Sequence, residues 1–202
     1  MNIPDNADAV PLTAVGISGG VDSSASALML KELGHKVIGV TMTLGRGNEE
    51  AELEAARKAA ENLGIELKIF DFSSEWRRSV TEYIRSTYMA GRTPNPCIRC
   101  NETVKMRLLP KAAFGLGCGF FATGHYARLS TGADGSVALM RAIDRTKDQS
   151  YFLYRVSHEI LKRTIFPLGG MTKAEVREYA LGRGITAAAK SDSQEQQRRN
   201  IA

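Results

Sequence analysis

The stretch that decides the fold is Ser18-Gly19-Gly20-Val21-Asp22-Ser23-Ser24. It follows a short apolar run, residues 12–17, and precedes the apolar spacing of a helix over residues 22–33. Two adjacent glycines let the backbone approach a ligand closely. The N–H groups at the start of a helix attract anions, and serine hydroxyls add further donors. The stretch therefore predicts a strand, a turn that binds phosphate or pyrophosphate, and a helix.

Two better-known phosphate motifs do not match this turn. The lysine of GxxxxGK[ST] is missing, and the glycines do not follow GxGxxG. An ordinary glycine-rich turn with a Ser or Asp cap remains the alternative. The full heptad between a strand and a helix favours the phosphate site, and it resembles the pyrophosphate loop of ATP pyrophosphatases. Those enzymes adenylate a substrate and release pyrophosphate.

Strands and helices alternate along the first 123 residues. The predicted strands are 12–17, 36–42, 66–71 and 119–123, and the predicted helices are 22–33, 49–62, 74–89 and 101–114. Ser73 or Ser74 is expected to cap the third helix, residues 91–100 to form an ordered loop, and Pro110 to kink or end the fourth helix. This order predicts an α/β fold, a parallel sheet with helices on both faces.

The pattern changes after His125. Residues 126–130 and 137–141 predict a hairpin, and residues 149–156 and 172–183 predict helices, the last with a capping box of Thr172 and Glu175. We expect a small hairpin and helical extension. Ligands on parallel sheets bind beyond the carboxyl ends of the strands. The turn, Met42 and Gly124-His125 all fall at that edge.

Composition indicates a globular chain of 202 residues, 43% hydrophobic and 24% charged. No apolar run approaches the ~20 residues of a membrane span, and the start of the chain lacks the pattern of a signal peptide. The expected location is cytoplasmic. We expect a flexible N-terminus over residues 1–10, a catalytic domain over residues 11–190 and a tail over residues 191–202.

Positive charge is concentrated in residues 77–111. That segment has eight Lys and Arg residues and only two acidic ones, Glu82 and Glu102. Such clustering favours a polyanionic partner such as RNA, although a solvated basic helix face would have the same composition.

Four motifs in one order make the resemblance specific: SGGVDSS (18–24), PNPCIRCN (94–101), ATGHYAR (122–128) and KDQSYFL (147–153). Together they resemble the tRNA-specific 2-thiouridylases over about residues 12–195. The resemblance implies an adenine-nucleotide alpha-hydrolase-like fold. It also implies that ATP adenylates O2 of the wobble uridine of a tRNA, that Mg²⁺ spreads the phosphate charge, and that sulfur displaces AMP.

The resemblance also assigns residues to roles. Gly16, Ile17, Ser18, Gly19, Gly20, Val21, Asp22, Ser23, Met42 and Gly124 would bind ATP. Asn95, Pro96 and Cys97 would surround the target base, and His125, Lys147, Asp148 and Gln149 would contact tRNA. Cys100 would be the catalytic thiol, with Cys97 beside it. Positive charge lowers the pKa of a thiol, and Arg99 and Lys105 would supply it if they face the loop.

Several residues of the motifs have plainer interpretations. Met42 could be a core residue and His125 a hydrogen-bonded histidine at a strand end. Tyr151 and Phe152 are expected in the core rather than as base-stacking platforms. Cys118 is typical of an inert buried thiol.

The CxxC pair has further interpretations. It could form a redox disulfide, a zinc half-site or, with Cys118, a [4Fe–4S] cluster.

The tail departs from the family. Residues 190–195 resemble the stretch before the family's second active-site cysteine, which carries a persulfide, but no cysteine follows to Ala202. A truncated or degraded copy is therefore one hypothesis, and a short form that takes sulfur from another cysteine or a persulfide donor protein is a second. An inactive nucleotide- and tRNA-binding remnant, or a thiolase or amidase of the same superfamily with another substrate, remain alternatives.

Overall fold

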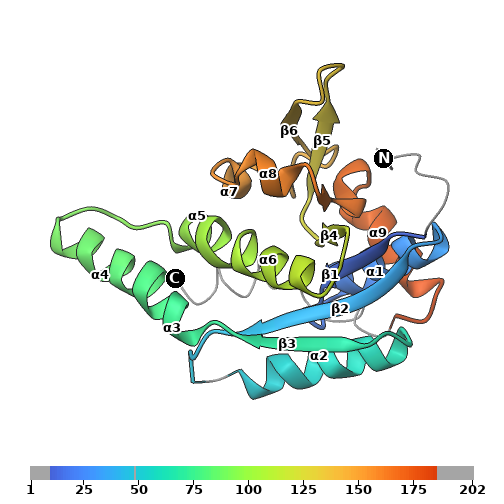
Figure 1. Ribbon diagram of the computed structural model, residues 1–202, viewed down its shortest axis with the longest axis horizontal. Coiled ribbons are helices and arrows are strands. Elements are labelled where there is room, and N and C mark those ends of the chain that lie inside the picture. The colour runs from blue at the N-terminus through green and yellow to red at the C-terminus, as the bar shows by residue number, and fades with distance from the viewer. Residues whose placement is uncertain (1–9, 48, 186–202) are drawn as a thin grey trace.

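The computed structural model describes residues 10–47 and 49–185 (Figure 1). The flexible N-terminus expected over residues 1–10 lies outside these ranges except for Val10, and so does the predicted tail, residues 191–202. Within the described residues no helix is both long and apolar enough to cross a membrane.

A parallel five-stranded sheet forms the centre of the molecule, in the order β3-β2-β1-β4-β7. Its strands are β1 (Leu12–Gly16), β2 (Lys36–Thr43), β3 (Leu67–Asp71), β4 (Phe120–Ala122) and β7 (Thr164–Ile165). The predicted α/β fold with four of these strands is confirmed. Strand β7 was not predicted, because two residues are too few to show an alternating pattern.

Alternation along β1 assigns each face of the sheet its own helices. Ala14 packs with Leu109 in one cluster of buried residues, and Val15 packs with Leu30 in another. Successive side chains of a strand point to opposite faces, so the two clusters lie on opposite sides. Helices α1 (Val21–Glu32) and α2 (Glu50–Asn62) supply one face and α6 (Leu108–Gly115) the other (Figure 1).

The helix predicted over residues 74–89 consists of three parts. These are α3 (Ser73–Trp76), a π-helical segment η1 (Arg77–Thr81) and α4 (Glu82–Met89), which projects from the sheet as an arm (Figure 1). The predicted serine cap is wrong, because the cap position is Phe72 and it makes no side-chain cap bond. The Asp71 carboxylate takes that place, accepting a 2.9 Å hydrogen bond from the Ser73 N–H.

The loop predicted over residues 91–100 ends early. Helix α5 (Pro96–Cys100) begins inside it and runs into a π-helical segment, η2 (Asn101–Lys105), before α6. The Asn95 side chain caps α5 by accepting a hydrogen bond from the Ile98 N–H, 3.2 Å. Proline suits a first helical turn, where its missing N–H has no partner to lose. The break predicted near Pro110 lies just before α6.

The C-terminal extension contains the predicted hairpin, β5 (Ala127–Thr131) and β6 (Val137–Arg141). The helix predicted over residues 149–156 shortens to α7 (Ser150–Leu153), and α8 (His158–Leu161) and η3 (Pro167–Gly170) were not predicted. Helix α9 (Lys173–Leu181) begins with the predicted capping box of Thr172 and Glu175.

Candidate functional site

The glycine-rich turn, residues 18–24, holds its shape by internal hydrogen bonds. The Ser23 hydroxyl accepts a bond from the Ser18 N–H (3.2 Å) and donates one to the Gly20 carbonyl (3.0 Å), and Ser24 donates to the same carbonyl. Gly20 is the N-cap of α1 and has no side chain to bond the first N–H groups of the helix. These groups lie beside exposed Ser18 and Gly20, as an anion site requires.

Two glycines allow the close packing at this turn. Gly19 has φ +76°, and a Cβ placed on it would lie 2.5 Å from the backbone of Ala55 in α2. A Cβ on Gly124 would lie 2.9 Å from the carbonyl carbon of Asp22. Gly124 therefore lies against the first turn of α1, and the structure brings together two segments that the sequence placed at the same edge.

A buried lysine that the sequence did not single out lies beside the turn. The Lys173 ammonium, at the start of α9, is 2.7 Å from both carboxylate oxygens of Asp22, and its side chain is only 8% exposed. The Tyr126 hydroxyl donates a 2.9 Å bond to the same carboxylate. The pairing joins residues 151 positions apart. The sequence around Lys173 does not indicate this pairing, because its local pattern is fully accounted for by the capping box of Thr172 and Glu175.

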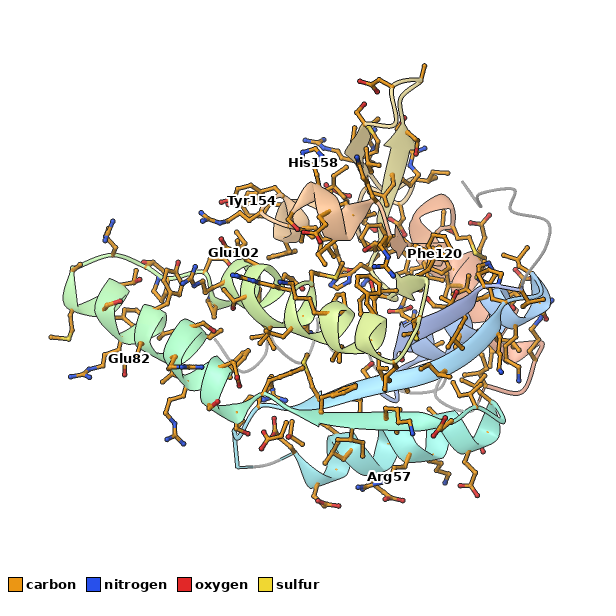
Figure 2. All side chains as sticks on the ribbon, in the orientation of Figure 1. Arg57, Glu82, Glu102, Phe120, Tyr154 and His158 are labelled. Atoms are coloured by element: carbon orange, nitrogen blue, oxygen red, sulfur yellow. The ribbon has the colours of Figure 1, made fainter. Side chains whose placement is uncertain are left out.

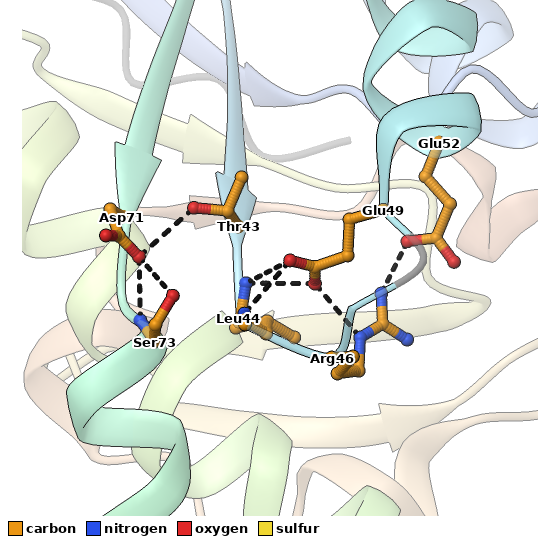
Figure 3. A network of polar contacts seen from close by, with 8 residues as sticks. Thr43, Leu44, Arg46, Glu49, Glu52, Asp71 and Ser73 are labelled. Atoms are coloured by element: carbon orange, nitrogen blue, oxygen red, sulfur yellow. Dashed lines mark hydrogen bonds and ion pairs between the residues drawn. The ribbon is translucent and has the colours of Figure 1, made fainter.

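A polar network holds the chain after β2 and β3 (Figure 3). The Glu49 carboxylate accepts hydrogen bonds from the N–H groups of Leu44 and Gly45, at 2.9 Å each, and from the Arg46 guanidinium. Across the edge, the Asp71 carboxylate accepts a 3.1 Å bond from the Thr43 hydroxyl. These bonds hold Arg46 at the carboxyl edge of the sheet.

The two cysteines of the CxxC motif differ in exposure. Cys97 is exposed and Cys100 is buried, and both are free thiols, as is buried Cys118. Burial raises the pKa of the Cys100 thiol, and the charges of Lys105 and Arg46 act in the opposite direction. The charge of Lys105 thus acts in the expected direction, but burial outweighs it and the pKa of the Cys100 thiol lies above its ordinary value.

The Arg99 guanidinium is bound by groups other than the thiol. Its guanidinium donates to the Ser79 carbonyl and to the Glu102 carboxylate, both at 3.1 Å. Arg46 takes its place among the charges that act on Cys100.

The alternative interpretations of the cysteines are a disulfide and a metal or iron–sulfur site. No two cysteines are joined, and among residues 10–47 and 49–185 no three His, Cys, Asp or Glu side chains gather closely enough to hold a metal ion. Cys118 is 1% exposed, and burial raises the pKa of its thiol, as expected of an inert buried cysteine.

Residues predicted around the target base lie on and before α5. Asn95 caps the helix, Pro96 opens it, and Cys97 follows on its exposed side. Next to Cys100, the amide oxygen of Asn101 is buried without a hydrogen-bond partner in the described part of the chain. Among the residues described, it is the one buried side-chain acceptor without a partner. Leaving such an atom without a partner destabilises the fold, so this oxygen is available to a donor that binds beside the thiol.

The residues predicted to contact tRNA have structural partners. His125 Nδ1 lies 2.7 Å from the Thr123 hydroxyl, and burial lowers the pKa of the ring to about 3. The Gln149 side chain accepts a 3.0 Å bond from the Tyr126 N–H, and Asp148 accepts one of 2.8 Å from the Ala142 N–H. Lys147 lies just before them and is partly exposed.

Met42, which was predicted to bind ATP, is partly buried and packs against the core.

Tyr151 contradicts the expectation that it belongs to the core. It is 64% exposed, whereas Phe152 is partly buried. Helix α7 has only four residues, too few for a helical pattern of apolar residues to show which side faces the core.

Comparisons with known proteins agree with this geometry. The sequence model of a family described as "tRNA methyl transferase HUP domain" matches residues 12–196. The tRNA-specific 2-thiouridylase MnmA of Geotalea uraniireducens is 46% identical over 90% of this chain and 52% of its own length. The enzyme of the same name from Geobacter metallireducens is 45% identical over 90% of this chain and 53% of its own. The chain thus spans about half the length of these relatives.

Solved structures share the fold. A 4-thiouridine synthetase–RNA complex with bound ATP superposes with a TM-score of 0.65 at 19% identity, covering 90% of this chain and 43% of the other. A predicted subunit of tRNA methyltransferase from Methanocaldococcus jannaschii gives 0.57 at 22% identity, covering 85% and 74%. Because the family model matches residues 12–196, and the four motifs occur in order within that range, the chain belongs to the tRNA methyl transferase HUP domain family.

Proposed function

We propose that this chain is the ATP-using catalytic part of a tRNA uridine 2-sulfurtransferase, with residues 11–190 as its catalytic domain. It adenylates O2 of the wobble uridine and directs sulfur to the activated C2. One observation carries the proposal: the uncapped N-terminus of α1 follows β1 at the carboxyl edge of the sheet, and Arg46, held at that same edge after β2, acts through its charge on the Cys100 thiol of α5. The 2-thiouridylases that resemble the chain at 45–46% identity support the same reaction.

The phosphate turn fits the triphosphate of ATP. Gly19 and Gly20 leave the N–H groups of the first turn of α1 uncovered, and the helix dipole adds positive potential there. Uridine O2 attacks the α-phosphorus and pyrophosphate leaves. The turn stabilises the charge of the departing pyrophosphate, because its donors are already in place before the reaction.

Adenylation makes a poor leaving group into a good one. Sulfur attacks C2 of the activated uridine, and the C2–O2 bond breaks as AMP takes the oxygen. Cys100 is the residue that we assign to sulfur transfer, since it is the buried thiol on which the charges of Lys105 and Arg46 act. Cys97, exposed on the same short helix, faces the incoming base and a persulfide donor protein.

Mg²⁺ would supply charge neutralisation on the phosphates when bound. Magnesium in nucleotide sites uses few protein ligands, typically one or two carboxylates in addition to phosphate oxygens. Asp22 is the carboxylate of the turn, and it is already bonded to Lys173 and Tyr126.

The proposal is tested by its first half-reaction. Purified chain, ATP and an unmodified tRNA transcript should exchange labelled pyrophosphate into ATP, and exchange should require the tRNA. Omitting the sulfur donor should not matter, because adenylation precedes sulfur transfer. Exchange without tRNA would redirect the function to another substrate of the superfamily. ATP and tRNA binding without any exchange would favour a non-catalytic remnant.

The second half-reaction is tested on the cysteines. With a persulfide donor supplied, Cys100→Ser should abolish 2-thiouridine, measured by mass spectrometry of tRNA nucleosides, while pyrophosphate exchange persists. Cys118→Ala is the matched control, a buried thiol in the turn before β4 that should leave thiolation intact. Full thiolation by Cys100→Ser would remove this residue from the reaction.

A further inference from the structure

An exposed aromatic pair lies at the mouth of a cleft in the C-terminal extension. Tyr151 and Tyr154 are 64% and 59% exposed, and their rings stack with centroids 5.9 Å apart and planes 29° from parallel. Two large exposed rings are unusual on a surface that needs no partner. Tyrosines of this kind are typical of interfaces, because a rigid ring provides much contact area at little cost in conformational entropy.

The cleft beside the pair has the size of a ligand site. Its volume is about 530 Å³, and its walls come from β6 and from the segment containing α7 and α8. Val137, Leu139 and Val156 provide apolar wall, and Arg141 and His158 line it as well. Figure 2 shows Tyr154 and His158 on the same side of this segment.

Charge around the cleft favours an anionic partner. Arg141 is exposed, and the Arg155 side chain is 50% exposed next to Tyr154. The acidic residue that lines the cleft, Asp148, accepts hydrogen bonds from the Ala142 N–H and the Ser150 hydroxyl. Its carboxylate is therefore held by the protein's own donors, and Arg141 is the exposed cation at the cleft that an RNA phosphate can approach.

The aromatic pair lies close to the CxxC helix. Helix α7 contacts α5 and η2. The Arg155 guanidinium is 2.8 Å from the Glu102 carboxylate of η2, which also pairs with Arg99 of α5. A strand that presents a base at Cys97 therefore passes within reach of these tyrosines.

From these observations we propose that Tyr151 and Tyr154 form a stacking platform for an unpaired nucleobase of the RNA, next to the base that reacts. Every base has a π-face, so a stacking platform accepts any of them, and cations beside it hold the backbone. The inference rests on the proposed function, because the strand it names belongs to the same RNA. It adds a binding site and the class of its ligand: a single-stranded, unstacked nucleotide.

The test uses the full chain and two probes. One is an unmodified tRNA transcript, and the other is a single-stranded RNA carrying 2-aminopurine, whose fluorescence falls when the base stacks. The double variant Tyr151→Ala/Tyr154→Ala should bind the tRNA about fivefold to a hundredfold more weakly. The same variant should lose the fluorescence quenching. The slope of log affinity against log salt should stay the same, because no phosphate contact is removed.

Two further variants separate stacking from folding. Tyr151→Phe/Tyr154→Phe keeps both rings and should keep the affinity and the quenching. Leu181→Ala, an apolar residue 65% exposed on α9, should change neither. A fall in the salt slope of the double alanine variant would overturn the platform, since it would mean lost phosphate contacts.

The outcomes also separate this inference from the proposed function. Unchanged tRNA affinity in the double alanine variant, with pyrophosphate exchange intact in the wild type, would overturn the platform alone and leave the cleft to a protein partner. Tyrosine-dependent RNA binding without any exchange would support the platform and contradict the proposed reaction.

Discussion

Replacing Asp22 by asparagine should cost more stability than replacing Lys173 by methionine, although the two changes break the same ion pair. The Lys173 side chain is 8% exposed and that of Asp22 is 32% exposed. After Lys173→Met, the carboxylate keeps the Tyr126 hydroxyl, and water reaches a third of it. After Asp22→Asn, a deeply buried ammonium loses both of its 2.7 Å bonds to a carboxylate.

The expected magnitudes follow from what each variant leaves behind. Removing one partner of a buried pair costs about 3–5 kcal/mol when the remaining charge cannot reach water. An asparagine oxygen still accepts one bond, so we expect about 2–4 kcal/mol for Asp22→Asn. A partly hydrated carboxylate with one retained hydrogen bond should cost less, about 1–2 kcal/mol for Lys173→Met.

Urea denaturation followed by circular dichroism measures these free energies of unfolding. The double variant Asp22→Asn/Lys173→Met removes both charges, so it should be more stable than Asp22→Asn alone. High salt should change little, because a buried pair is poorly screened. Additive effects, or a larger loss for Lys173→Met, would refute the argument that the buried ammonium dominates.

Three further predictions concern the glycine-rich turn, the Cys100 thiol and the half-buried His125. Gly19→Ala should weaken ATP binding at least tenfold, measured by calorimetry, because the added Cβ would overlap the backbone of α2. Gly64→Ala is the control for backbone strain alone, because Gly64 also has a positive φ but has no atom within 4 Å of the added Cβ. Lys105→Ala should slow the alkylation of Cys100 by iodoacetamide and shift the pH profile of that reaction to higher pH, because a charge that lowers the pKa of the thiol is lost. An unchanged alkylation rate would contradict this effect of Lys105. Burial lowers the pKa of His125 from 6.5 to about 3. Below pH 6.5 the unfolded chain therefore binds more protons than the folded chain, and the free energy of unfolding decreases as the pH is lowered. Between pH 6.5 and 5 this loss is about 2 kcal/mol, and His125→Gln should remove it in denaturation curves; equal pH dependence of both proteins would contradict it.

Much of the fold could be predicted because its signals are local. The glycine-rich turn, the capping box at Thr172 and the four longer strands each depend on residues close together in the sequence. The errors lie where local patterns conflict. Two prolines suggested a loop over residues 91–100, whereas Asn95 and Pro96 begin a helix. The site residues of the motifs were found in the same way, but their roles remain predictions.

By itself the sequence determined that a strand, a glycine-rich turn and a helix belong to an α/β fold, because backbone freedom at adjacent glycines and hydrophobic spacing are properties of neighbouring residues. Only the tertiary structure decided that Lys173 pairs with Asp22, that Gly124 packs on the first turn of α1, and that Tyr151 lies at the surface. Each of these depends on residues that are distant in sequence and share a buried volume or a surface. Such pairings are set by how the whole core packs, and no local pattern encodes them.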